Sequence, residues 1–176
     1  MEVRATNKAK ELAIAILKSN KIYDALGAEH VLDSNIDIAE GAFLEKLVRD
    51  NCFVRTIEVG CANGISSLFI CSALPSENAH HTIIDPFLST DWRNIGITQL
   101  RNAGIENVSL VEEVSEIALP KLLSEGAKFD FAFIDGWHTF DHTLLDMFYM
   151  SRLLKVGGVM VVDDVSMKGV ERAVNY

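Results

Sequence analysis

Three acidic residues follow apolar segments in the second half of the chain. Asp135 comes directly after residues 129–134, and Asp163 and Asp164 come directly after residues 159–162. If these segments are neighbouring parallel strands, about 4.8 Å apart, the three carboxylates meet at one edge of a sheet. Carboxylates so close repel one another and raise their pKa values, and a divalent cation removes the repulsion. Oxygen ligands suit Mg²⁺ or Ca²⁺ better than zinc, so all three are candidate metal ligands. Alternatively, one acid caps a helix and the others are solvated.

A histidine stands close to the first of these acids. His138 lies three residues after Asp135, at the start of the next predicted helix. Its ordinary pKa lies near neutral pH, so it could take a proton from a hydroxyl group held beside it. His138 and Asp135 are therefore the candidate catalytic residues. A structural hydrogen bond from a histidine at a helix start is the alternative reading.

A glycine-rich bend follows an apolar segment near residue 60. Its sequence is Glu58-Val59-Gly60-Cys61-Ala62-Asn63-Gly64-Ile65-Ser66. Gly60 allows a sharp turn, and Gly64 would let a ligand approach the main chain where no Cβ stands in the way. The GxxxG spacing differs from the GxGxxG of dinucleotide-binding folds, which disfavours a pyrophosphate. The bend could also serve only the packing of strand against helix.

Asp85 ends the next apolar segment and favours ligand binding, over packing alone, as the role of the glycine bend. An acid at the end of the second strand can accept hydrogen bonds from both hydroxyls of a ribose. Capping of the following helix is the alternative, although Pro86 and Phe87 intervene. Together, the bend and Asp85 favour an adenosine-containing ligand.

The elements that must position these residues alternate along the chain. Short apolar segments predict strands at 56–60, 81–85, 108–111, 129–134 and 159–162. Helical patterns precede, separate or follow them at 6–18, 38–49, 64–73, 91–103, 115–124 and 139–153, with Asp37 as a helix cap. We expect an α/β fold, a Rossmann-like doubly wound and mostly parallel sheet of order 3-2-1-4-5, with ligands at the carboxyl edge. We expect a single fold unit, with residues 1–37 as an N-terminal helical cap and 38–176 as the ligand-binding domain.

The motifs together carry a family resemblance over about residues 38–166. The chain resembles class I S-adenosylmethionine-dependent methyltransferases, notably the caffeoyl-CoA and catechol O-methyltransferase branch and a bacterial subgroup that includes sugar O-methyltransferases. The residues that carry it are Ile38–Leu44, Glu58–Gly60 with Gly64 and Ser66, Phe129–His138, Leu153–Gly158 and Val162–Asp164. Members of the family continue through two more strands, so we expect this sheet to lack the final strands.

The resemblance implies roles for the individual residues. Glu58, Gly60 and Ser66 would line the methionine end of the cofactor, where Asp135 also lies. Asp85 would hold the ribose and Ser115 would lie near the adenine. Asp135, Asp163 and Asp164 would bind Mg²⁺ or another divalent cation, and His138 would act as the base. The implied activity is methyl transfer from S-adenosylmethionine to a hydroxyl of a small molecule, assisted by the metal.

Three other functions remain open at this stage. A non-catalytic module would bind the S-adenosylmethionine nucleoside without transferring a methyl group. A nicotinamide-dependent oxidoreductase would share the ribose-binding acid, although the GxGxxG loop is missing. A purely structural interaction protein would make no use of Asp135, Asp163 and Asp164.

Composition narrows the classes of partner. The 176 residues include 16 Lys+Arg and 25 Asp+Glu, for a formal charge of -9, which disfavours nucleic acid and anionic membranes. No apolar stretch approaches the roughly 18 residues of a membrane span. Three cysteines without metal-type spacing suit a reduced, cytoplasmic protein. We expect a small hydroxylated substrate, and an unpaired fifth strand could allow a homo-oligomer.

Overall fold

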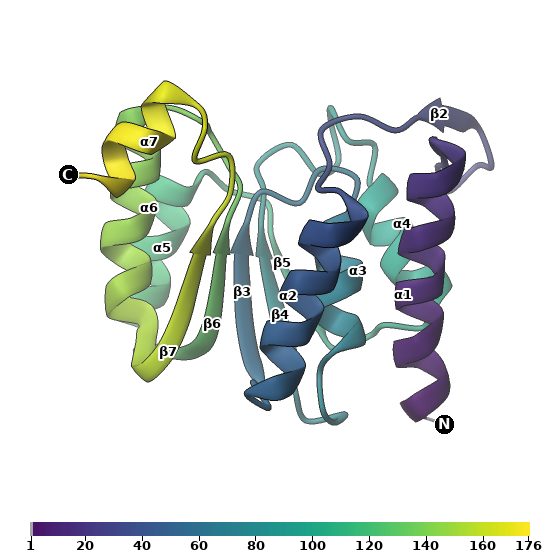
Figure 1. The fold of residues 1–176 in the computed structure, drawn as a ribbon, viewed down its shortest axis with the longest axis horizontal. Helices are drawn as coiled ribbons and strands as arrows, with labels where there is room; N and C mark the ends of the chain where they lie inside the picture. The colour runs from purple at the N-terminus through teal and green to yellow at the C-terminus, as the bar shows by residue number, and fades with distance from the viewer. Residues whose placement is uncertain (1) are drawn as a thin grey trace.

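A five-stranded parallel sheet forms the centre of the computed structural model, which describes residues 2–176 (Figure 1). The strands lie in the order β5-β4-β3-β6-β7. Their bounds are β3 Arg55–Val59, β4 His80–Ile84, β5 Val108–Val111, β6 Phe129–Ile134 and β7 Leu154–Val162. This arrangement confirms the predicted order, because the first predicted strand lies in the middle and the third and fifth lie at the edges.

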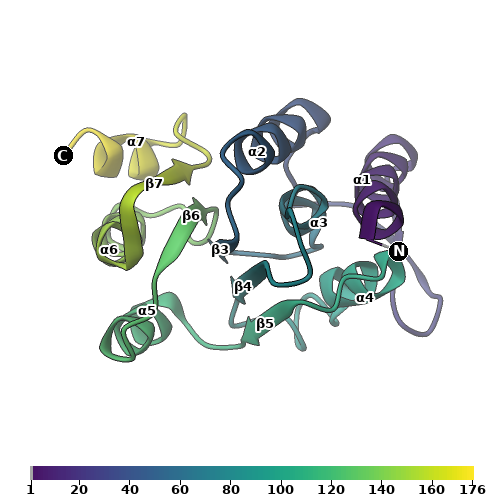
Figure 2. The ribbon, with the colours of Figure 1, turned by 90° about the horizontal axis from the view of Figure 1, so that it is seen from below.

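Helices cover both faces of the sheet, as Figure 2 shows. Two separate groups of buried apolar side chains fill the spaces between helices and sheet. One group joins the sheet to α1 (Glu2–Ser19), α2 (Ile38–Asp50), α3 (Ile65–Ser72) and α4 (Ile95–Ala103). The other joins it to α5 (Ser115–Ser124) and α6 (Phe140–Leu153), and α7 (Lys168–Val174) packs on α6. The fold is therefore doubly wound, as the alternation of elements predicted.

Local sequence signals place several helix starts. Asp37 caps α2 and accepts a hydrogen bond from the Glu40 N–H, while the Glu40 side chain accepts one from the Asp37 N–H. Thr139 caps α6 in a similar way through its side chain. The predicted helix 91–103 begins later, at Ile95, because Arg93 and Asn94 adopt left-handed backbone conformations.

Two parts of the chain differ from the expected elements. A short antiparallel hairpin, β1 (Lys21–Tyr23) with β2 (Glu29–Val31), follows α1. The strand predicted at 159–162 begins earlier, at Leu154, and the pairing of this strand, β7, with β6 is irregular between Phe129 and Phe131. Within residues 2–176, none of the helices combines the length and apolarity needed to cross a bilayer.

Candidate functional site

A cavity of about 780 Å³ opens at the carboxyl edge of the sheet. Its walls come from segments that follow all five strands of the sheet and from the segment that precedes α2. The lining residues used below are Ser34–Ile36, Gly60–Ala62, Ser66, Asp85–Phe87, Ser115, Asp135–His138, Asp163 and Asp164. The structure thus brings most of the predicted site residues into one cavity, because parallel strands end at a common edge.

The glycine bend is shaped by close contacts within the chain. Gly60 has a φ of +88°, and a Cβ there would overlap the backbone carbonyl of Asp135. Gly64 has a φ of +79°, and its Cβ would lie 2.7 Å from the Cα of Gly96 in α4. Gly64 therefore lets two backbone segments meet, and it does not line the cavity. The need for a glycine here thus comes from packing within the chain, whereas the sequence analysis expected the approach of a ligand.

Asp85 lies on the same side of the sheet as this bend and holds it. One carboxylate oxygen accepts hydrogen bonds of 3.0 Å from the N–H groups of both Cys61 and Ala62. The other accepts one of 2.9 Å from the N–H of Phe87. Because three main-chain donors orient it, the buried Asp85 carboxylate is fixed at the cavity wall. Its contact with a ribose stays a prediction.

Ser66 lines the cavity, whereas Glu58 lies buried behind the lining. Glu58 is fully buried and does not line the cavity. It accepts a hydrogen bond of 3.0 Å from the Ser66 hydroxyl and another from Ser67, and its Oε1 lies 3.3 Å from Nε2 of His81. That last pair is a close approach without a hydrogen bond, since Nε2 of His81 has no hydrogen-bond partner among the described residues. Ser66 lines the cavity, and Glu58 supports it from beneath.

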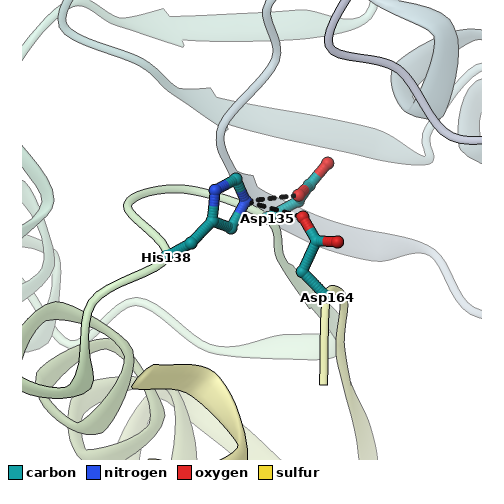
Figure 3. Close-up of side chains that lie close together, drawn as sticks. All are labelled: Asp135, His138 and Asp164. Carbon is teal, nitrogen blue, oxygen red and sulfur yellow. Dashed lines mark hydrogen bonds and ion pairs between the residues drawn. The ribbon is translucent and has the colours of Figure 1, made fainter. Parts of the chain in front are cut away.

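The acidic cluster gathers two carboxylates and one imidazole (Figure 3). Nε2 of His138 lies 3.3 Å from Oδ1 of Asp135 and 3.0 Å from Oδ2 of Asp164. One ligand atom from each of the three lies within 4.8 Å of the others. Asp163 lines the cavity nearby, but its Oδ1 accepts a hydrogen bond from the Asp164 N–H. The grouped residues thus differ from the three carboxylates expected from the sequence, with His138 in the place of Asp163.

The charges of this cluster perturb one another. Burial raises the pKa of Asp135 to about 6, and the negative charges of Asp163 and Asp164 act in the same direction, against the hydrogen bond from His138. The pKa of His138 is raised, chiefly by its hydrogen bond to Asp135. Two carboxylates and an imidazole with converging ligand atoms are a donor set that fits a divalent cation.

Some lining residues were not predicted from the sequence. Ser34, Asn35 and Ile36 reach the cavity from the segment before α2. The Asn63 side chain of the glycine bend donates a hydrogen bond of 2.7 Å to the carbonyl of Asp33, which ties that segment to the bend. No local pattern marks this contact, since it joins distant parts of the chain. Ser115, which was predicted, lines the cavity at the start of α5.

The doubly wound parallel sheet has a nucleoside-sized cavity at its carboxyl edge and a fixed acid, Asp85, directly after β4. Together these features define an α/β domain of the class I methyltransferase type. A family model described as a methyltransferase domain matches residues 57–165. The match covers more than half of the chain, so the chain belongs to this family of methyltransferase domains.

Two curated relatives and one solved structure illustrate the similarity. Caffeoyl-CoA O-methyltransferase of Populus kitakamiensis is 29% identical over 135 residues, 74% of this chain and 54% of the relative. Catechol O-methyltransferase B of Danio rerio is 30% identical over 147 residues, 81% of this chain and 54% of the relative. The chain therefore spans about half the length of these relatives. The O-methyltransferase from Bacillus cereus in complex with SAH has a TM-score of 0.73 and 17% identity, covering 96% of this chain and 77% of its own, which shows a shared fold.

Proposed function

We propose that the protein is an S-adenosylmethionine-dependent O-methyltransferase that acts on a hydroxyl group of a small molecule. One observation carries the proposal. A single cavity holds both the glycine bend anchored by Asp85 and the cluster of Asp135, His138 and Asp164. The first suits an adenosine-containing cofactor, and the second suits the deprotonation of a hydroxyl.

The cofactor would lie along the lining of the bend. Asp85 would accept hydrogen bonds from the ribose hydroxyls while its bonds to Cys61 and Ala62 keep it oriented. Gly60, Ser66 and Asp135 would surround the methionine part, and Ser115 would face the adenine. The negative charges of Asp135 and Asp164 favour a cationic sulfonium close by.

The acidic cluster would also hold a divalent cation, for which Mg²⁺ is our choice. Asp135 and Asp164 would be its carboxylate ligands, with Asp163 beside them in the cavity lining, while His138 would remain free to accept a proton. A bound dication would lower the pKa of the acceptor hydroxyl and orient it.

The chain's own residues account for the remaining chemistry. S-adenosylmethionine, when bound, would supply the methyl group to the acceptor oxygen, and the electron pair of its carbon–sulfur bond would stay on sulfur. The neutral form of His138, whose pKa is raised by Asp135, would accept the hydroxyl proton. The walls of the cavity would position the acceptor hydroxyl against the cofactor, and such positioning supplies a large part of the rate.

Titration and a transfer assay test the two halves of the proposal. We expect isothermal titration calorimetry to detect binding of S-adenosylhomocysteine to the intact chain. We expect labelled S-adenosylmethionine to transfer its methyl group to at least one of a catechol, caffeoyl-CoA or a hydroxylated sugar, more slowly with EDTA than with Mg²⁺. Absence of S-adenosylhomocysteine binding contradicts the whole proposal. Binding without transfer to any acceptor contradicts its enzymatic half and leaves a non-catalytic binding module.

A further inference from the structure

The charged side chains that line the cavity are acidic, apart from the imidazole of His138. The five acids are Glu40, Asp85, Asp135, Asp163 and Asp164. Within the part of the chain that the structure describes, neither a lysine nor an arginine lines the cavity or forms an ion pair with one of these acids. A cavity walled by charges of one sign concentrates their field. The empty cavity therefore attracts cations and repels anions.

The ligands of the proposed reaction would not cancel this charge. A divalent cation would bring two positive charges, and S-adenosylmethionine would bring a net one, since its carboxylate offsets its ammonium group. The five carboxylates of the lining exceed these positive charges. The remaining field favours a methyl acceptor that is positively charged and disfavours one that is negatively charged.

Helix starts beside the cavity could offset the acids, because the N-terminus of a helix carries a partial positive charge. At the start of α2, however, the Asp37 carboxylate accepts a hydrogen bond of 2.8 Å from the Glu40 N–H, and Glu40 adds a second negative charge. Glu116 lies in the first turn of α5. The first turn of α3 has no acidic residue, and the carboxylate of a bound cofactor suits that place. The helix starts therefore leave no free place for an anionic acceptor.

Glu40 is the cavity acid to which the proposed function gives no role. It reaches the lining from α2, close in the chain to the lining residues Ser34–Ile36. Its Oε2 accepts a hydrogen bond of 2.7 Å from the Asp37 N–H. Because a glutamine at this position can keep that bond, the charge of Glu40 can be removed while the helix cap stays in place.

Aromatic side chains in the same lining also suit an organic cation. Trp137 directly precedes His138 and is 48% exposed. The ring of Phe87 meets it edge-on, with 5.9 Å between the ring centroids, and Trp92 lines the cavity as well. The faces of aromatic rings attract ammonium groups. Acids and aromatic rings thus occur together beside the candidate base.

We propose that the methyl acceptor is a small hydroxylated amine, positively charged at neutral pH, and that the Glu40 carboxylate contributes to this preference. Acyl-CoA thioesters carry several negative charges on their phosphates and are poor acceptors for this cavity, although one relative is a caffeoyl-CoA O-methyltransferase. The inference rests on the proposed function and deepens it.

The test compares acceptors that share their reacting hydroxyls and differ in charge. In a catechol set, dopamine is cationic, 4-ethylcatechol is neutral and 3,4-dihydroxyphenylacetate is anionic. Glucosamine, glucose and glucuronate form a second set of the same kind, and caffeoyl-CoA is a separate anionic acceptor. With labelled S-adenosylmethionine and Mg²⁺, we expect kcat/KM to be about 30-fold higher for the cation than for the anion of the set that is methylated, with the neutral acceptor between them. High salt should reduce this ratio at least about threefold, because it screens the field of the acids.

Two variants test the contribution of Glu40. We expect Glu40→Gln to reduce the ratio at least about threefold, mainly through a higher KM for the cationic acceptor, a change that a merely structural role would not produce. Glu116→Gln is the matched control, because Glu116 is also an exposed glutamate in the first turn of a helix but lies outside the lining. It should keep the wild-type ratio. If Glu40→Gln does not fold, the salt dependence of the wild-type ratio decides the question.

Each outcome bears on the inference. Equal kcat/KM values for the cationic and anionic acceptors, or a preference for an anionic acceptor such as caffeoyl-CoA, overturn it and leave the proposed function standing. A folded Glu40→Gln variant with the wild-type ratio overturns the contribution of Glu40. If S-adenosylhomocysteine binds but none of the acceptors is methylated, the enzymatic half of the proposed function fails and the inference fails with it.

Discussion

A Cβ on Gly60 would overlap the carbonyl oxygen of Asp135 and lie 2.6 Å from its carbonyl carbon. The bend after β3 and the segment after β6 therefore touch through their main chains. The contact joins the residues proposed for the cofactor to the acidic cluster. It also explains why a glycine is required at this position independently of any ligand.

Gly60→Ala should strongly destabilise the protein. The left-handed φ of +88° costs an L-residue about 1–2 kcal/mol, and the overlap with Asp135 adds to this. We expect a loss of about 3 kcal/mol or more in the free energy of unfolding, measured by urea denaturation. Gly157→Ala is the matched control, because Gly157 has a φ of +86° with nothing within 4 Å of its Cβ position. Equal losses in the two variants would show that the contact with Asp135 is unimportant.

Asp85→Ala should loosen the glycine bend. It leaves the N–H groups of Cys61 and Ala62 without their acceptor, which should cost about 2–4 kcal/mol of unfolding free energy. We also expect at least a tenfold loss in affinity for S-adenosylhomocysteine by calorimetry, about 1.4 kcal/mol. Glu112→Ala serves as a control, since Glu112 accepts a hydrogen bond from the Ser89 N–H at an exposed site. A variant at 85 that binds like the wild type would exclude Asp85 from the cofactor site.

Metal affinity should depend unequally on the three acids. Asp135→Asn and Asp164→Asn each remove a carboxylate of the cluster that surrounds His138. We expect each to weaken Mn²⁺ binding at least tenfold by calorimetry, about 1.4 kcal/mol. Asp163→Asn keeps an oxygen that can accept the Asp164 N–H, so its effect should be smaller. An equal loss at position 163 would instead favour the three-carboxylate set predicted from the sequence.

The buried Asp146 should make stability depend on pH. Its pKa is raised by burial to about 6 in the folded state, above its ordinary value of 3.8, so the folded state favours the protonated form. The associated stability is fully present below the unfolded pKa and is lost as the pH rises through about 6. Relative to Asp146→Asn, the wild-type protein should lose about 2–3 kcal/mol between pH 4 and pH 7 in urea denaturation. A difference between the two proteins that does not change with pH would contradict this titration.

Much of the fold could be predicted from the chain alone, because its signals are local and repeated. Short apolar segments that alternate with helical patterns dictate a parallel sheet covered on both faces, and the order β5-β4-β3-β6-β7 follows the prediction. The acids that end strands, Asp85 and Asp135 among them, reach one cavity because parallel strands end together. The Asp37 cap was likewise readable from neighbouring residues.

The tertiary structure alone decided which partners these side chains meet. Glu58 turns beneath the bend to Ser66, and Gly64 packs against Gly96. His138 joins Asp135 and Asp164, while Asp163 accepts a backbone hydrogen bond. The burial of Asp146 depends on the packing of α6 in the folded protein, and no sequence pattern indicated it. A sequence pattern determines where a strand or helix ends, but the direction of a side chain and its partner depend on segments far away in the chain.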